Sequence, residues 1–199
     1  MSSKRIKLYT FVFILGATLL FSWFWTEGYG ISPKYQYGNT EEKALNFWYK
    51  RGLSNIGVSK IISVVDIQKD KKLIIYKSNK NELWSGLVRK RWNNKWIVIE
   101  QGGGVPLFDN EENKERVLDW KWHNMNEFGL TLGVINKLNV DKVLVDGKDA
   151  VILNADDEKV WYFIDQTGSS YVDNKPILDI KAFDENDNLI YSYKDNLGR

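Results

Sequence analysis

Three acidic clusters contain the residue types and the spacing that could hold a metal ion. Residues Asp184 to Asn188 read DENDN, which begins like the calcium loop of an EF-hand, and Asp195 lies at the twelfth position of such a loop. Leu189 stands at the sixth position, where that loop requires glycine, and both flanking segments read as strands. Because Asp and Asn form turns by hydrogen bonding to their own backbone, we predict a hairpin turn here.

The other two acidic clusters are interpreted in the same terms. Asp156 to Glu158 lies between two predicted strands and is predicted to be a turn. Asp109 to Glu112 lies in a polar stretch between the two halves of the chain, where a cation site is the alternative to a plain loop. We therefore assign no metal ligand and no cofactor.

His123 is the single histidine of the chain and could act as a general base or a pH sensor. Alternation places it on the polar side of a predicted strand, together with Asp119 and Lys121. The chain has no cysteine, and it contains no nucleophile elbow, zinc motif or phosphate loop. We predict that His123 is a surface or cross-strand residue, and we assign no catalytic residue.

A basic and aromatic run, Arg89 to Trp92, is followed by Trp96 across a predicted two-residue turn at Asn93-Asn94. Pairing across that turn would place Arg91 opposite Trp96. Such a patch could contact anionic lipid headgroups, a cell-wall polymer or a carbohydrate. The alternative is a solvent-facing strand on which arginine stems cover tryptophan rings.

The segment Leu8–Trp25 carries no charge over 18 residues. As a helix it would span roughly 27 Å, which is close to the thickness of a hydrocarbon core. Basic residues precede it and Glu27 is the first charge after it, so the positive-inside rule places the body outside. We predict a cytoplasmic tail (1–7) and a transmembrane helix (8–25). A cleaved signal peptide is the alternative, but no small-residue cleavage pattern follows the segment, so we predict that the helix is uncleaved.

The remainder of the chain changes from helical to extended patterns. After a Gly-rich linker (26–38), Asn39 and Glu42 resemble a capping box for a helix over Thr40–Arg51. Alternating or β-branched runs then predict antiparallel strands. These predicted strands are Lys60–Gln68, Leu73–Tyr76, Leu83–Trp92, Lys95–Gln101, Val117–His123, Phe128–Ile135, Lys142–Val145, Ala150–Asn154, Val160–Ile164, Leu178–Phe183 and Leu189–Tyr193.

These elements predict an α+β chain. It would comprise an N-terminal transmembrane helix, then a helix plus antiparallel meander forming a roll (39–105), then a mostly antiparallel β-sandwich-like domain (106–199). The glycine run at 102–104 is predicted to end the last strand of the roll. Residues 26–199 contain 25 Lys and Arg beside 26 Asp and Glu, a balance that does not suit a nucleic-acid binder.

Several stretches carry a resemblance: EEKALNFWYKRG, VDKVLVDGKDAVIL, VWYFID and LDIKAFDENDNLIYSY. They resemble uncharacterised, single-pass membrane-anchored extracytoplasmic proteins of Gram-positive bacteria. The helix-plus-meander half also resembles cystatin-like and NTF2-like α+β rolls. The resemblance implies an anchored domain outside the cytoplasm and carries over no catalytic residue.

These observations favour a membrane-anchored extracytoplasmic binding or accessory module of a bacterial cell envelope, without catalysis. The expected partners are the membrane, through the single-pass anchor, and another envelope protein or a cell-wall polymer, with no nucleic acid. The alternatives are an envelope hydrolase that uses loop carboxylates, or a membrane stress or immunity protein.

Overall fold

The computed structural model describes residues 12–22, 38–51, 56–91, 94–107, 116–125, 127–166, 171–172, 175–176 and 178–194. The chain divides into two compact units, Met1–Gln36 and Tyr37–Arg199. In the first unit, residues 12–22 form a helix whose large apolar side chains, such as Phe13 and Leu20, are exposed.

The predicted transmembrane helix over residues 8–25 is corrected by this observation. The described helix of eleven residues (12–22) spans only about 16 Å at 1.5 Å per residue, roughly half of a hydrocarbon core. Within the described part of the chain, none of the helices combines the length and the apolar character needed to cross a membrane.

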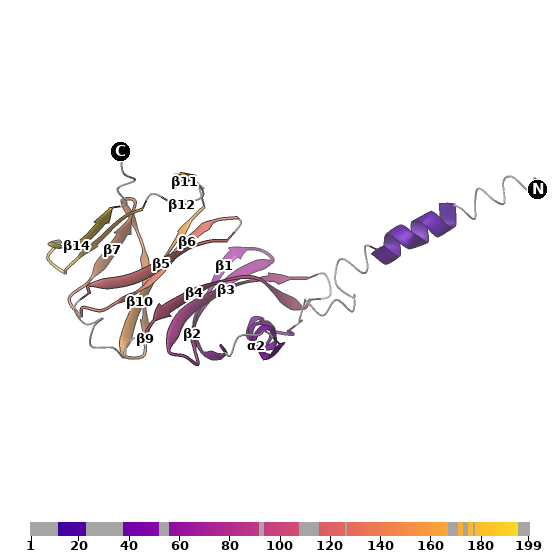
Figure 1. Ribbon diagram of the computed structural model, residues 1–199, viewed down its shortest axis with the longest axis horizontal. Helices are drawn as coiled ribbons and strands as arrows, with labels where there is room; N and C mark the ends of the chain where they lie inside the picture. The colour runs from indigo at the N-terminus through magenta and orange to yellow at the C-terminus, as the bar shows by residue number, and fades with distance from the viewer. Residues whose placement is uncertain are drawn as a thin grey trace, which may run out of the picture. The chain divides into compact units, whose positions relative to one another are not determined.

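The second unit is built from antiparallel sheets that follow one short helix, α2 (Glu41–Arg51) (Figure 1). The first sheet has the order β1 (Val58–Gln68), β2 (Lys71–Ser78), β3 (Glu82–Lys90), β4 (Trp96–Pro106). The second sheet has the order β5 (Leu118–Asn124), β6 (Gly129–Ile135), β10 (Glu158–Asp165), β9 (Val151–Ala155). The third sheet has the order β14 (Leu189–Lys194), β13 (Asp179–Phe183), β7 (Lys142–Val145), β8 (Lys148–Asp149). A separate pair consists of β11 (Tyr171–Val172) and β12 (Lys175–Pro176). The prediction of a β-rich chain is therefore confirmed.

The second sheet lies between the other two and is buried on both faces. Leu132 and Val160 on one face pack with Leu73 and Leu87 of the first sheet. On the opposite face, Trp161 packs with residues of the third sheet, among them Val145, Ile180 and Ala182. Every residue of β6 is buried as a result, which explains the nearly continuous apolar run GLTLGVI.

The predicted α+β class with a helix-covered roll is wrong, because sheet-on-sheet packing dominates the core. The helix α2 does pack on the outer face of the first sheet through Ala44 and Leu45. However, the inner face of that sheet is covered by the second sheet, so the helix covers only one of its two packed faces. The division into domains at residues 105 and 106 stays a prediction, although strands from both sides share one core.

The start of α2 also differs from the expected capping box. The Oγ1 of Thr40 accepts a hydrogen bond from the backbone N–H of Lys43 at 3.2 Å, so Thr40 caps the helix in place of Asn39. Glu41 near the first turn forms an ion pair with Lys72 of the neighbouring sheet at 2.8 Å.

The hairpin between β3 and β4 is one residue longer than predicted. Lys90 pairs with Trp96, and the N–H of Arg91 donates to the carbonyl of Lys95 at 2.8 Å. Three residues, 92–94, therefore separate the strands, and Asn94 has a φ of 60°, as expected in a three-residue hairpin loop. Because side chains alternate along a strand, this one-residue change places Arg91 and Trp96 on opposite faces of the sheet, whereas the prediction had placed them on the same face.

The glycine run does not end a strand, because β4 continues through it to Pro106. Gly103 and Gly104 have positive φ values of 144° and 79°, and the pairing with β3 shifts by one residue between Leu83 and Trp84. A Cβ on Gly103 would lie too close to the Trp84 backbone, so glycine is needed for this bulge.

Gly133 of β6 provides a direct test of the packing between neighbouring strands of the second sheet. A Cβ there would clash with the backbone oxygen of Asp119 and would lie 2.7 Å from Trp161 Nε1 and 2.8 Å from Trp120 Cβ, so we expect Gly133→Ala to lower the unfolding free energy by about 1–3 kcal/mol. Urea denaturation measures the change. Gly57→Ala is the control, because its methyl group would meet only the Asn79 side chain at 3.6 Å. Equal midpoints for both variants would contradict the packing described above.

Candidate functional site

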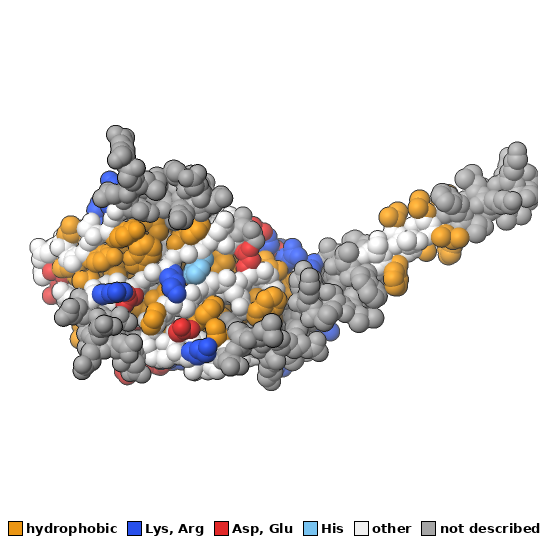
Figure 2. Space-filling view, in the orientation of Figure 1, with side chains coloured by type: hydrophobic (Ala, Val, Ile, Leu, Met, Phe, Trp, Pro, Cys, Tyr) orange, Lys and Arg blue, Asp and Glu red, His pale blue; other side chains and the backbone are white. Residues whose placement is uncertain are grey.

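The second unit has a hollow between two edge strands. The strand β5 lies at one edge of the second sheet, and β14 lies at one edge of the third. The hollow encloses about 500 Å³ and is lined by Arg116, Val117, Leu118, Asp119, Trp120, Tyr191 and Tyr193. We call it the aromatic groove, and in Figure 2 hydrophobic side chains gather on the surface between β14 and β5.

The three aromatic rings in the groove hold one another in place. The indole Nε1 of Trp120 donates a hydrogen bond to the hydroxyl oxygen of Tyr191 at 3.2 Å. The rings of Trp120 and Tyr193 meet edge to face, with centroids 4.9 Å apart and planes at 69°. All three side chains are half-buried, so their backs rest on the core and part of each ring faces solvent.

The end of the groove contributed by residues 116–119 is polar but balanced in charge. The guanidinium of Arg116 pairs with a carboxylate oxygen of Asp119 at 3.1 Å, and the Arg116 side chain is 68% exposed. The other carboxylate oxygen of Asp119 accepts a hydrogen bond from Asn136 Nδ2 at 2.9 Å. Asp119 is thereby fixed by two partners, and it orients the arginine above the groove.

Local strand geometry produces this arrangement from two short sequences. Trp120 lies on the same face of β5 as Trp122, and Tyr191 and Tyr193 are likewise two residues apart on β14. The sequence predicted the shared face of Leu118, Trp120 and Trp122, and this is confirmed. It missed the tyrosines, although the alternation in LIYSYK was visible, because adjacency between β5 and β14 depends on the packing of two sheets.

The basic and aromatic patch predicted around Trp96 is divided between two faces. Trp96 is only 7% exposed, and the ammonium groups of Lys72 and Lys90 lie 5.3 and 5.9 Å from its ring centre. Arg89 pairs with Ile97 and therefore lies on the other face of the sheet. Trp92 lies outside the described residues. The sugar or lipid platform, which was one of two alternatives for this run, is not assembled by the residues that the structure describes here.

His123 lies against the glycine run of β4. A Cβ on Gly102 would lie 2.5 Å from the imidazole Cγ, and the ammonium of Lys121 donates to the carbonyl of Gly104 at 2.6 Å. Glycine therefore permits β5 to approach β4 closely. Burial, together with the nearby charge of Lys121, lowers the pKa of His123 below its ordinary value. The imidazole is neutral at physiological pH, which suits the predicted cross-strand role.

The acidic run at 184–188 forms the predicted hairpin turn. One carboxylate oxygen of Asp184 accepts hydrogen bonds from the backbone N–H groups of Asn186 and Asn188, both at 2.9 Å. Hydrogen bonds from Asn188 and the turn backbone lower the pKa of Asp184. Asp156 likewise occupies a turn with a φ of 58° and forms an ion pair with Lys60. The third cluster, Asp109 to Glu112, lies outside the described residues.

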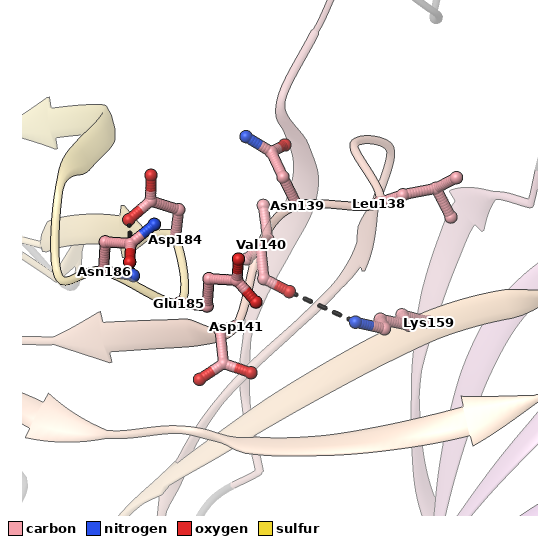
Figure 3. A pocket seen from close by; sticks show the side chains of 8 residues that line it. All are labelled: Leu138, Asn139, Val140, Asp141, Lys159, Asp184, Glu185 and Asn186. Carbon is pink, nitrogen blue, oxygen red and sulfur yellow. Dashed lines mark hydrogen bonds between the residues drawn. The ribbon is translucent and has the colours of Figure 1, made fainter.

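A second hollow of about 390 Å³ lies beside the Asp184 turn. It is lined by Leu138, Asn139, Val140, Asp141, Lys159, Asp184, Glu185 and Asn186 (Figure 3). The ammonium of Lys159 donates to the carbonyl of Val140 at 3.3 Å across one side of it. Among the described residues no group of three or more acidic or histidine side chains is arranged to hold a metal ion.

The carboxyl groups of Glu100 and Glu127 lie close enough for their charges to interact. Burial and the nearby charge of Glu127 raise the pKa of Glu100, and one oxygen of Glu100 is buried without a hydrogen-bond partner. Glu127 in turn forms an ion pair with Lys71, whose side chain is only 12% exposed. A carboxyl with a raised pKa beside a second carboxyl is an arrangement that acid catalysts use.

In comparisons with known proteins, no family model, no curated protein and no solved structure matches this chain. The class of this protein is therefore defined by its fold and its groove. It is an antiparallel β domain of three packed sheets with an aromatic groove between two edge strands.

The environment of His123 makes a measurable prediction. We expect its imidazole to titrate below the ordinary pKa of 6.5, because burial disfavours the charged form. The contribution of the neutral His123 to the free energy of unfolding is fully present above pH 6.5. It is lost as the pH falls from 6.5 toward the folded-state pKa. NMR titration is unambiguous because the chain has one histidine. Lys121→Gln should raise the value by removing a positive charge, and a folded-state pKa at or above 6.5 would overturn this interpretation.

The environment of Glu100 predicts a stabilising substitution. Glu100→Gln should raise the urea midpoint at neutral pH, since it removes a buried charge that lies close to Glu127. The gain in stability should vanish below the ordinary pKa of 4.5, where Glu100 is protonated in both states. It should grow as the pH rises from 4.5 to the raised folded-state pKa, and it should stay constant above that pKa. Exposed Glu185→Gln is the control, and a gain of equal size there would refute a local cause.

Proposed function

We propose that this chain is a non-enzymatic binding or accessory module of a bacterial cell envelope. The observation that carries the proposal is the aromatic groove, in which Trp120, Tyr191 and Tyr193 are held in fixed orientations at a partly exposed surface. Binding sites combine apolar rings with a small number of placed polar groups, and Arg116 with Asp119 supplies the polar part. Trp, Tyr and Arg are also the residues that most often dominate binding energies.

We further propose that the protein is located at the cell membrane, with the second unit outside the cytoplasm. The support for a membrane location is the uncharged sequence of residues 8–25, together with the preceding basic residues, which can contact anionic lipid headgroups. The helix formed by residues 12–22 exposes apolar side chains that are suited to association with lipid. The proposal concerns membrane association and depends on no spanning helix.

An envelope hydrolase is the second candidate, and the carboxylate pair Glu100 and Glu127 favours it. A hydrolase needs both carboxylates beside a cleft that admits substrate. Neither residue lines the two hollows described above. Glu127 is also engaged by Lys71, so the pair is better explained as part of the contact between the first and second sheets.

Co-sedimentation with purified cell-wall material from a Gram-positive bacterium tests the proposed function. The full chain, kept in a polyoxyethylene detergent, should pellet with the wall material in a saturable way, and Trp120→Phe should reduce the bound fraction by about half or more. Lys60→Gln, which alters an exposed ion pair with Asp156 far along the chain from the groove, is the matched control. The wall-binding function is rejected if the wild type stays in the supernatant. It is also rejected if Trp120→Phe and Lys60→Gln change the bound fraction by the same amount.

A further inference from the structure

We propose that the aromatic groove binds an uncharged glycan chain, with pyranose rings stacked on Trp120 and Tyr193 and hydroxyl groups bound by Arg116 and Asp119. This inference rests on the proposed binding function and names its ligand class. It draws on three properties of the groove: the fixed rings, the balanced polar end and the position between two edge strands.

The rings offer the apolar part of such a site. One face of a pyranose ring presents C–H groups, which pack favourably on the electron-rich face of an aromatic ring. The hydrogen bond from Trp120 Nε1 to Tyr191, at 3.2 Å, sets the orientation of the indole before any ligand arrives. Because the rings are already ordered, little conformational entropy is lost when a sugar binds.

The polar end offers the hydrogen-bonding part. A guanidinium has donors in a fixed planar fork, and a carboxylate accepts from two directions, so together they suit adjacent hydroxyl groups. Arg116 is 68% exposed and Asp119 is held by Asn136, so a donor that reaches solvent lies beside an acceptor that is fixed in position. Tyr191 adds a hydroxyl that can still donate its own proton.

The charge at the groove favours a neutral ligand over an acidic or basic polymer. Among the described residues that line it, the charged ones are Arg116 and Asp119, and these two are paired with each other at 3.1 Å. An acidic polymer would need an unpaired cation, and binding it would leave the Asp119 carboxylate close to another negative charge. An uncharged glycan avoids both costs.

An extended peptide is the competing occupant, because β5 and β14 are edge strands. A peptide that adds a strand takes most of its affinity from backbone hydrogen bonds, which a change of one aromatic side chain alters little. A glycan that stacks on Trp120 depends on that ring directly. The two ligand classes therefore differ in how they respond to substitutions within the groove.

Isothermal titration calorimetry of the full chain, in a detergent without sugar groups, tests the proposal with four probes. Chitohexaose and cellohexaose are the neutral glycans, a galacturonate hexamer is the acidic one, and a decapeptide of alternating Thr and Val represents strand addition. We expect saturable binding of at least one neutral hexasaccharide. Trp120→Phe should weaken it by about tenfold, and Tyr191→Phe, which removes a single oxygen, by about threefold.

Trp84→Phe is the matched control. The indole of Trp84 is also half-buried, and its Nε1 donates to Glu82 at 2.9 Å, but it belongs to the first sheet and lies outside the groove. It should change the affinity by less than about twofold. Circular dichroism confirms that each variant is folded, and Tyr191→Phe keeps the shape of the groove if Trp120→Phe disturbs it.

The outcomes separate the ligand class from the function. No saturable binding of either neutral hexasaccharide, or equal losses for Trp120→Phe and Trp84→Phe, overturns the glycan proposal. Tighter binding of the galacturonate hexamer or of the decapeptide also overturns it. If cell-wall material is still bound in a manner that depends on Trp120, the binding function stands and only the ligand class is wrong. If wall binding fails as well, both proposals fall.

Discussion

The second sheet, buried on both faces, is the constraint on which the rest of the second unit depends. Its strand β6 is buried at every residue, and Gly133 at its centre leaves the space that Trp161 and Trp120 occupy. Trp161 is 1% exposed and its Nε1 lies over Gly133 without a hydrogen-bond partner among the described residues. A buried N–H of this kind costs about 1–3 kcal/mol, which the apolar packing of the large ring offsets.

This packing also creates the aromatic groove at the open side of the same interface. Trp161 on β10 fills the centre between the second and third sheets, whereas Trp120 lies on β5 at the edge of the second sheet. The tyrosines of β14 lie at the matching edge of the third sheet. Rings at the edge have support on one side and solvent on the other, so the same apolar face that stabilises the fold becomes accessible where the sheets end.

The sequence predicted local structure well and the arrangement of the sheets poorly. Alternation in VLDWKWH predicted which side chains of β5 share a face, and this is observed. The Asp-Gly pair at Asp146-Gly147 is a sequence typical of a tight hairpin turn, and its φ values of 51° and 75° agree with one. These features depend on neighbouring residues alone. The order β5-β6-β10-β9 depends on pairing between distant segments, and no local pattern specifies that order.

The errors at the β3–β4 hairpin and in the fold class have distinct physical causes. The sequence Asn93-Asn94 suits a two-residue turn, but a positive φ at Asn94 alone also suits a three-residue loop, and that difference of one residue exchanged the two faces. The fold class was wrong because α2 carries an apolar face whether or not another sheet covers the opposite side of β1–β4. Periodicity measures the amphipathicity of an element and gives no information about which partner it meets.

The candidate site shows why functional residues are harder to predict than core residues. Half-buried rings such as Tyr191 and Tyr193 have the same alternation as core side chains, so the pattern cannot separate a structural aromatic from a binding one. What distinguishes them is a relation between strands: a hydrogen bond from Trp120 across 71 residues of sequence, and an edge-to-face contact with Tyr193. Trp96 shows the converse, because its basic neighbours resembled a binding patch while its ring is buried beneath Lys72 and Lys90. The type of residue therefore suggests a chemistry, and the termination of the sheets decides which of these residues solvent and ligand can reach.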